Sequence, residues 1–117
     1  MTYEEAHELL EKMVAELPDE ILKGLNCGII LTDETITDAD GLVILGCYHV
    51  EPMGLGRYIT IHYGSLVACY GHHHRYFEDK IRDVLHHELI HHLEHLAGDK
   101  SLEKQDEIDR ARMLFKR

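Results

Sequence analysis

The stretch from His86 to Asp106, HHELIHHLEHLAGDKSLEKQD, decides the organisation of this chain. Apolar residues recur within it and just before it at spacings of three and four, which predicts an amphipathic helix from about Phe77 to Ala97. These apolar positions are Val84, Leu85, Leu89, Leu93 and Leu96. Gly98 follows the last of them, where a left-handed C-terminal cap is expected. A second helix is predicted after this turn, from about Ser101 to the C-terminus.

The predicted helix contains an HExxH motif, His87-Glu88-Leu89-Ile90-His91. Residues four apart share a helix face, so His87 and His91 can bind one metal ion, and Zn²⁺ accepts imidazole nitrogen readily. Glu88 can reach a water molecule held by that metal and act as its general base. Because the two histidines lie beside the leucine stripe, we expect them at the edge of a cleft. The alternative is a polar helix face without metal.

A catalytic zinc site usually has three protein ligands. Ala97 occupies the position six residues after His91, which excludes both the metzincin spacing and the HxxxHxxxxxH spacing of metal-dependent endoribonucleases. His95 is also excluded, because three ligands along one straight helix would spread over about 12 Å. The missing ligand is therefore expected outside this helix.

The second helix is expected to return antiparallel to the first after Gly98. Asp106 lies about as far after Gly98 as His91 lies before it, and Glu103 lies nearer the bend. The sequence therefore predicts Asp106 as the third ligand, with Glu103 a close alternative and Asp99 next. Each of these carboxylates could instead be an ordinary surface group.

A second motif overlaps the first. His91-His92-Leu93-Glu94-His95 fits HxxEH, the inverted zincin pattern, with Glu94 as the base. We favour HExxH, because it leaves room for the ligand-bearing turn, whereas His95 lies close to the helix end.

Composition limits the class of protein. Hydrophobic residues make up 44% and charged residues 29% of 117 residues, which predicts one soluble domain, residues 1–117. No apolar run could span a bilayer, and the acidic start MTYEEAHELL is unlike a secretory signal. The net charge of −10 disfavours nucleic acid as a partner. Cys27, Cys47 and Cys69 form no CxxC pair and are expected to be reduced thiols in the cytoplasm.

The N-terminal half predicts a helix followed by strands. Thr2 to Glu5 fits a capping box, Pro18 ends the helix, and Asp19 to Lys23 could form another turn closed by Gly24. The predicted strands are Cys27–Leu31, Leu42–Val50, buried on both faces, and Arg57–Tyr63, half-buried. Asp33–Asp40 and His72–His74 are expected in loops, and Gly64-Ser65 is expected to break the last strand. The order of elements predicts an α+β fold.

The motif region resembles the small bacterial zincin-like "metallopeptidase family" proteins, the minimal HExxH type. It matches their pattern HExxHHxExLAGxxxLExxD, and ELPDEILKGLNCGIIL and LGCYHVEPMGLGRYITIHYGSL are also similar. The resemblance implies a minimal zincin-like fold and zinc-dependent hydrolysis of peptide bonds, without implying a substrate. A related branch with HExxHxxGxxD has aspartate where this chain has Ala97, which leaves the third ligand open.

The expected function is therefore a zinc metallopeptidase that acts on a peptide or protein, with neither nucleic acid nor membrane as a partner. A substrate strand is expected to add to a sheet edge at Arg57–Tyr63. The candidate oxyanion stabilisers are Tyr48, Tyr58, His62 and Tyr63. Two alternatives are a metal-binding module without turnover and a structural helix whose histidines pair with carboxylates. The oligomeric state is not predicted.

Overall fold

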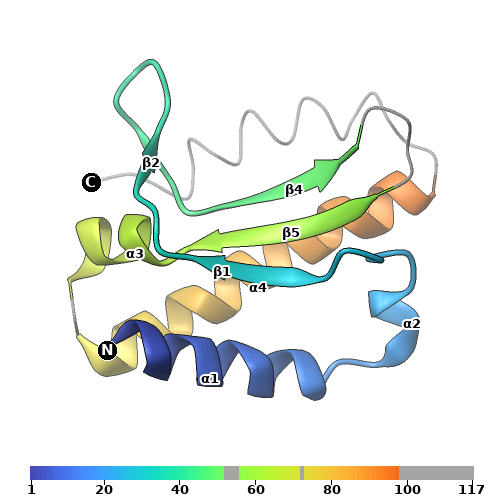
Figure 1. Cartoon of the computed structure of the whole chain (residues 1–117), viewed down its shortest axis with the longest axis horizontal. Coiled ribbons are helices and arrows are strands. Elements are labelled where there is room, and N and C mark those ends of the chain that lie inside the picture. The colour runs from blue at the N-terminus through green and yellow to red at the C-terminus, as the bar shows by residue number, and fades with distance from the viewer. Residues whose placement is uncertain (52–55, 72, 98–117) are drawn as a thin grey trace.

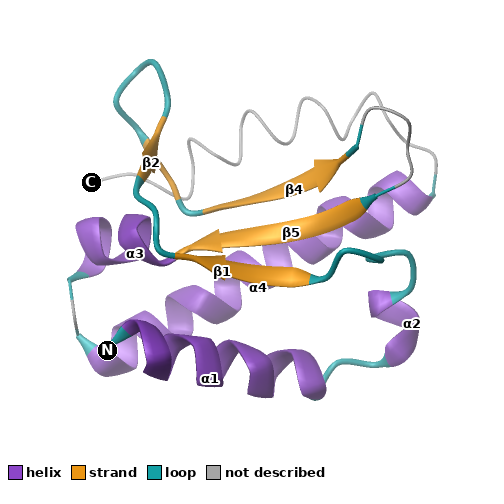
Figure 2. Ribbon diagram, viewed as in Figure 1, coloured by secondary structure: helices purple, strands orange, loops and turns teal. Residues whose placement is uncertain are grey.

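The structure is a computed structural model of the chain, and it describes residues 1–51, 56–71 and 73–97 (Figure 1). Helices and strands both contribute, which confirms the predicted α+β class (Figure 2). The elements in chain order are α1 (Tyr3–Ala15), α2 (Asp19–Leu22), β1 (Ile29–Thr32), β2 (Ile36–Thr37), β3 (Val43–Ile44), β4 (Gly46–Val50), β5 (Arg57–His62), α3 (Tyr63–Tyr70) and α4 (His74–Leu96).

The main sheet has three strands in the order β1-β5-β4, and β2 and β3 form a separate antiparallel pair. Strand β5 pairs in parallel with β1 and antiparallel with β4. The prediction that Arg57–Tyr63 offers a sheet edge is therefore wrong, because β5 has a neighbour on each side. Among the strands that the structure describes, β1 and β4 are the two edges of this sheet.

The predicted strand Leu42–Val50 is also wrong as a single element. It divides into β3 and β4, which belong to different sheets, and Leu45 lies between them. Its burial alternates, with Tyr48 buried and His49 only partly buried, so it is not covered on both faces. A continuous apolar run carries no local signal for the point at which a chain changes sheets.

Strand β5 is followed directly by α3, which occupies the apolar run after the predicted break. Ser65 and Leu66 are fully buried on this helix. A side chain at Gly64 could not fit, because a Cβ there would lie 2.7 Å from the carbonyl oxygen of Glu34. Gly64 therefore permits a close approach between the start of α3 and the segment before β2.

Two predictions at helix ends are confirmed. The Glu5 backbone N–H donates to the Thr2 hydroxyl at 3.2 Å, and the Thr2 N–H donates to the Glu5 carboxylate at 2.8 Å, which completes the capping box. Helix α2 is followed by Gly24, whose φ of 88° is the left-handed conformation that glycine adopts without strain. Helix α4 begins earlier than predicted, since His74 is its first residue rather than part of a loop.

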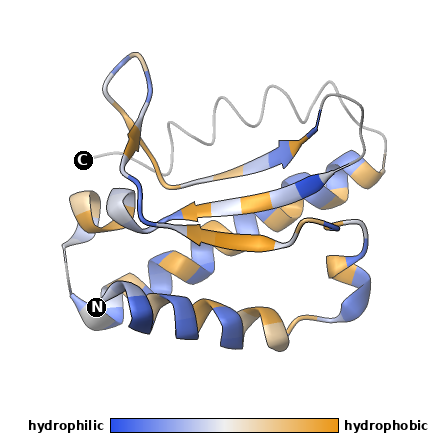
Figure 3. Ribbon diagram, viewed as in Figure 1, coloured by the Kyte–Doolittle hydropathy of each residue, from blue (hydrophilic) through white to orange (hydrophobic). Residues whose placement is uncertain are grey.

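The core lies between the sheet and the helices α1 and α4. Helix α4 packs against β4 and β5, and α1 packs against α4. Fully buried Ile59 and Ile61 of β5 share this core with Phe77, Ile81 and Val84 of α4. In Figure 3, most of α1 is coloured hydrophilic, its C-terminal end is coloured hydrophobic, and β1 is coloured hydrophobic.

In the described residues, no helix combines the length and hydropathy needed to cross a membrane. The predicted cap at Gly98, the C-terminal helix and the antiparallel turn all lie outside the described residues.

Candidate functional site

The HExxH motif lies in the middle of α4, on one flank of its buried face. Val84 and Leu85 are buried against the sheet, and the same side of the helix continues through Glu88, whose exposed fraction is 4%. His87 is half-buried, as expected for the edge of a cleft. His91 is only 1% exposed, so it lies deeper in the fold than the cleft edge at which it was predicted. The motif is therefore embedded in the fold.

Helix α4 crosses the edge strand β4 unusually closely at Gly46. A Cβ at Gly46 would lie 2.6 Å from Cγ1 of Val84, 3.1 Å from the Thr60 carbonyl oxygen and 3.6 Å from Cγ of Glu88. A glycine within a strand often marks such a close approach of another element. Gly46 thus brings the Glu88 side chain against the first residue of an edge strand. Sequence reasoning missed this role, although Gly46 interrupts the longest apolar strand pattern.

This contact predicts a measurable coupling between Gly46 and Val84. Gly46→Ala is expected to destabilise the fold by about 1–3 kcal/mol, because the added methyl overpacks against Val84. Val84→Ala, which removes the facing methyl groups, should cost about 1–3 kcal/mol by itself. The loss of unfolding free energy in the double variant should be at least about 1 kcal/mol smaller than the sum of the losses in the two single variants, because the methyl added at position 46 fills the space that the Val84 methyl groups vacate.

Urea denaturation of the four proteins completes this cycle. Gly28→Ala is the control, because Gly28 has nothing within 4 Å of its added Cβ and should show no coupling to Val84. Strict additivity of Gly46→Ala and Val84→Ala would contradict the close approach.

His92, the residue after the second predicted ligand, connects α4 to two other parts of the fold. Its Nε2 lies 2.7 Å from the Lys23 carbonyl oxygen and its Nδ1 lies 2.8 Å from the Tyr48 hydroxyl. A carbonyl oxygen only accepts, so Nε2 carries the proton and Nδ1 accepts from the tyrosine. A Cβ at Gly24 would lie 3.3 Å from this ring, so the turn after α2 also closes on His92. Sequence reasoning did not identify this pair.

These contacts reduce the set of oxyanion candidates. The Tyr48 hydroxyl donates to His92, and the Tyr63 hydroxyl donates to the Met1 carbonyl at 2.6 Å. Burial raises the pKa of Tyr63, and the nearby Asp33 carboxylate adds to the effect. The Tyr58 ring stacks on His49 with 4.4 Å between ring centroids. Of these three phenols, Tyr48 lies against α4, whereas Tyr58 and Tyr63 have their contacts elsewhere in the fold.

His62 belongs to a hydrogen-bonded row on the sheet. Its Nδ1 lies 2.8 Å from the Ile44 carbonyl, its Nε2 lies 3.0 Å from the Thr60 hydroxyl, and His49 Nε2 lies 2.8 Å from the same hydroxyl. Burial lowers the pKa of His49, and the neighbouring His62 lowers it further. Thr60 and His62 alternate with Ile59 and Ile61, so they lie on the sheet face turned away from α4. His62 is therefore not an oxyanion donor for the α4 site.

The remaining predicted ligands lie beyond the described chain. Asp106, Glu103 and Asp99 all fall there, and so does His72, while His73 is exposed before α4. Within residues 1–51, 56–71 and 73–97, no three His, Cys, Asp or Glu side chains are grouped closely enough to bind a metal ion. Of the predicted zinc ligands, the described residues therefore contain two, His87 and His91.

Those two ligands fit zinc in kind and spacing. His87 and His91 are one helical turn apart on the same flank, and the Nδ1 atoms of both rings are buried. Glu88 lies beside them and against β4, whereas Glu94, the base of the inverted motif, lies half-buried further along α4. Of the two candidate bases, Glu88 is the one next to Gly46 of β4.

Comparison with known proteins identifies one fold relative. No family model matches the chain, and no curated protein matches it. Among solved structures, the chain is similar to a conserved hypothetical protein from Thermus thermophilus, with a TM-score of 0.76 and 33% sequence identity. The similarity covers 97% of this chain and 96% of that one, so it extends across the whole α+β fold.

Proposed function

We propose that this chain, which belongs to the same family as the conserved hypothetical protein from Thermus thermophilus, is a zinc-dependent metallopeptidase. One observation carries the proposal. A buried carboxylate, Glu88, lies beside two imidazoles that share one flank of α4, and it lies directly against strand β4. Its proposed compartment is the cytoplasm, because Cys27, Cys47 and Cys69 are all thiols rather than halves of a disulfide.

His87 and His91 would hold the zinc ion, and a carboxylate from the C-terminal segment would complete its ligands. Bound zinc would bring the pKa of a water ligand to about 7 and polarise a peptide carbonyl. Glu88 would take the proton from that water and deliver it to the leaving amine. Its burial keeps the carboxylate in a fixed position and shields the proton transfer from bulk water.

Strand β4 replaces β5 as the proposed substrate edge. The Leu45 carbonyl accepts from His62 N–H at 2.9 Å, and Glu51 N–H donates to the Gly56 carbonyl at 2.8 Å. In an antiparallel ladder the next residues alternate in direction, so the main-chain groups of Gly46 and Tyr48 are directed to the outer edge. An extended substrate paired there would pass close to Glu88.

The decisive test is cleavage of a peptide library by the zinc-loaded protein, read by mass spectrometry, with Glu88→Gln as the variant that must lose it. Cleavage that needs Glu88 supports a peptidase. Zinc binding without any cleavage supports the metal-binding module instead.

A separate prediction concerns the third ligand. Asp106→Ala is expected to weaken zinc binding by more than the roughly 10- to 100-fold typical of a residue that only orients a ligand. Glu103→Ala should stay within that range, and competition with a fluorescent zinc chelator measures both. The reverse order would assign the ligand to Glu103, and unchanged affinity in both variants would move the assignment to Asp99.

A further inference from the structure

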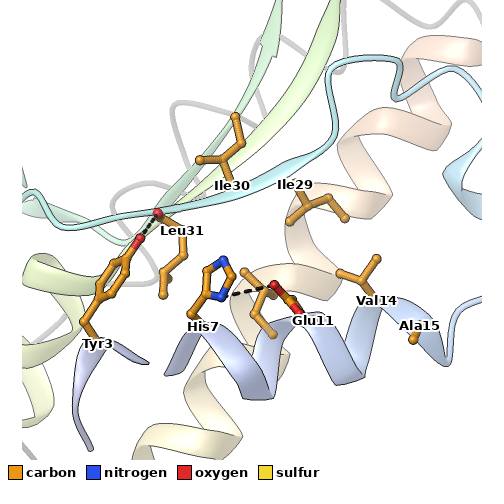
Figure 4. A pocket seen from close by; sticks show the side chains of 9 residues that line it. Tyr3, His7, Glu11, Val14, Ala15, Ile29, Ile30 and Leu31 are labelled. Atoms are coloured by element: carbon orange, nitrogen blue, oxygen red, sulfur yellow. Dashed lines mark hydrogen bonds and ion pairs between the residues drawn. The ribbon is translucent and has the colours of Figure 1, made fainter. Parts of the chain in front are cut away.

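A groove of about 570 Å³ lies between α1 and the edge strand β1, at the edge of the main sheet opposite β4 (Figure 4). Its volume falls within the roughly 300–1,000 Å³ of ligand-binding clefts. Val14 and Ala15 of α1 and the β1 residues Ile29 and Ile30 give it apolar walls. Ile30 is 44% exposed, and the β1 strand to which it belongs is coloured hydrophobic in Figure 3.

The main chain of β1 presents hydrogen-bonding groups to this groove. Ile59 N–H donates to the Gly28 carbonyl at 3.1 Å, so the alternation of a strand turns the peptide groups of Ile29 and Leu31 away from β5. The Tyr3 hydroxyl donates to the Leu31 carbonyl at 2.8 Å, which confirms that direction. Tyr3 occupies this acceptor at one end of the groove. Beyond it, the N–H and C=O of Ile29 are placed to pair with an added strand.

The α1 side of the groove carries one carboxylate, Glu11. Glu11 points into it and pairs with His7 at 3.2 Å, and both side chains remain about half or more exposed, 70% and 47%. Helix α1 also carries three other glutamates and a single lysine. An exposed carboxylate facing an aliphatic strand suits a partner with both basic and aliphatic side chains. It disfavours a second copy of this chain, because two acidic α1 helices would then approach each other.

We propose that this groove binds an extended peptide segment of another protein, with alternating aliphatic and basic side chains, as a short strand added to β1. Its main chain pairs with Ile29. Its aliphatic side chains lie beside Ile30 on one face of the sheet, and its basic side chains lie on the other face, toward α1, where one of them pairs with Glu11. The site lies at the opposite sheet edge from Glu88 and does not depend on zinc.

The test is fluorescence anisotropy of the full-length protein with a labelled peptide, acetyl-Val-Lys-Val-Lys-Val-Lys-amide, at low salt. Saturable binding is expected. Glu11→Lys should weaken it by about three- to tenfold, since one exposed ion pair is lost and a repulsion is added. Ala15→Trp, which fills the groove from an exposed helix position, should weaken it by at least about tenfold. Glu16→Lys is the matched control, because it makes the same charge change outside the groove and should alter binding by less than about twofold.

Two further measurements show where the peptide binds. Amide NMR signals of Ile29 and Leu31 should shift on titration, and a peptide N-methylated at alternate residues should not bind, because it cannot pair with β1. The proposal would be overturned if no saturable binding were seen, or if Glu11→Lys and Ala15→Trp bound the peptide as tightly as the wild type. It would also be overturned if the NMR shifts were confined to β4 and α4. Dimerisation that Ala15→Trp abolishes would also overturn it, since the groove would then hold a second copy. Unchanged circular dichroism and Tm establish that each variant is folded.

Discussion

Glu88→Gln is expected to abolish peptide cleavage while the protein keeps its zinc. Glutamine preserves the size and most of the packing of a side chain that is 4% exposed, but it cannot accept the proton from the attacking water. Loss of a general base typically lowers the rate by about 10²- to 10⁴-fold. Initial cleavage rates over a peptide library, measured together with zinc content by mass spectrometry, separate the loss of the base from the loss of the metal.

Glu94→Gln is the matched control for this prediction. Glu94 lies on the same helix and is half-buried, but it is Glu88 that lies next to Gly46. It should retain cleavage within a few-fold of the wild type. If Glu94→Gln is inactive and Glu88→Gln is active, the inverted HxxEH frame is the correct one.

The second large effect is on metal content. The protein purified without chelator is expected to carry about one zinc per chain, and His87→Ala or His91→Ala should remove most of it. Each variant deletes one of the two predicted imidazole ligands. Its zinc affinity should therefore fall by more than the roughly 10- to 100-fold that is typical when a residue that only orients a ligand is removed. Elemental analysis gives the stoichiometry, and chelator competition gives the affinity.

His86→Ala provides the control for the histidine variants. His86 is exposed on the same helix, beside His87 in sequence but turned away from it, and its removal should leave zinc content unchanged. Because His91 is almost fully buried, thermal unfolding must show that its variant is folded. Full zinc retention in the His87→Ala, His91→Ala double variant would end the metal hypothesis and favour a purely structural helix.

Local features were predictable from sequence where a single segment contains the whole signal. The Thr2 to Glu5 capping box, the turn closed by Gly24 and the long helix α4 follow from groups a few residues apart. The spacing of His87, Glu88 and His91 also specifies by itself that both histidines share one flank of that helix. These patterns act over one or two turns and do not depend on what packs against them.

Relations between distant segments were decided only by the tertiary structure. No local pattern distinguishes a central strand from an edge strand, so the sequence alone misplaced the substrate edge on β5 and joined β3 to β4. The closeness of Glu88 to β4 depends on a glycine far away in the chain, at position 46, and the contact of His92 depends on Tyr48. Likewise, the groove beside β1 exists because an acidic helix packs near an aliphatic edge. The sequence by itself thus determined the helices and the candidate catalytic residues. Strand order and side-chain packing determined which sheet edges are open to a substrate or a partner. The sequence could not show these edges, because strand pairing joins residues that are far apart in the chain and share no local signal.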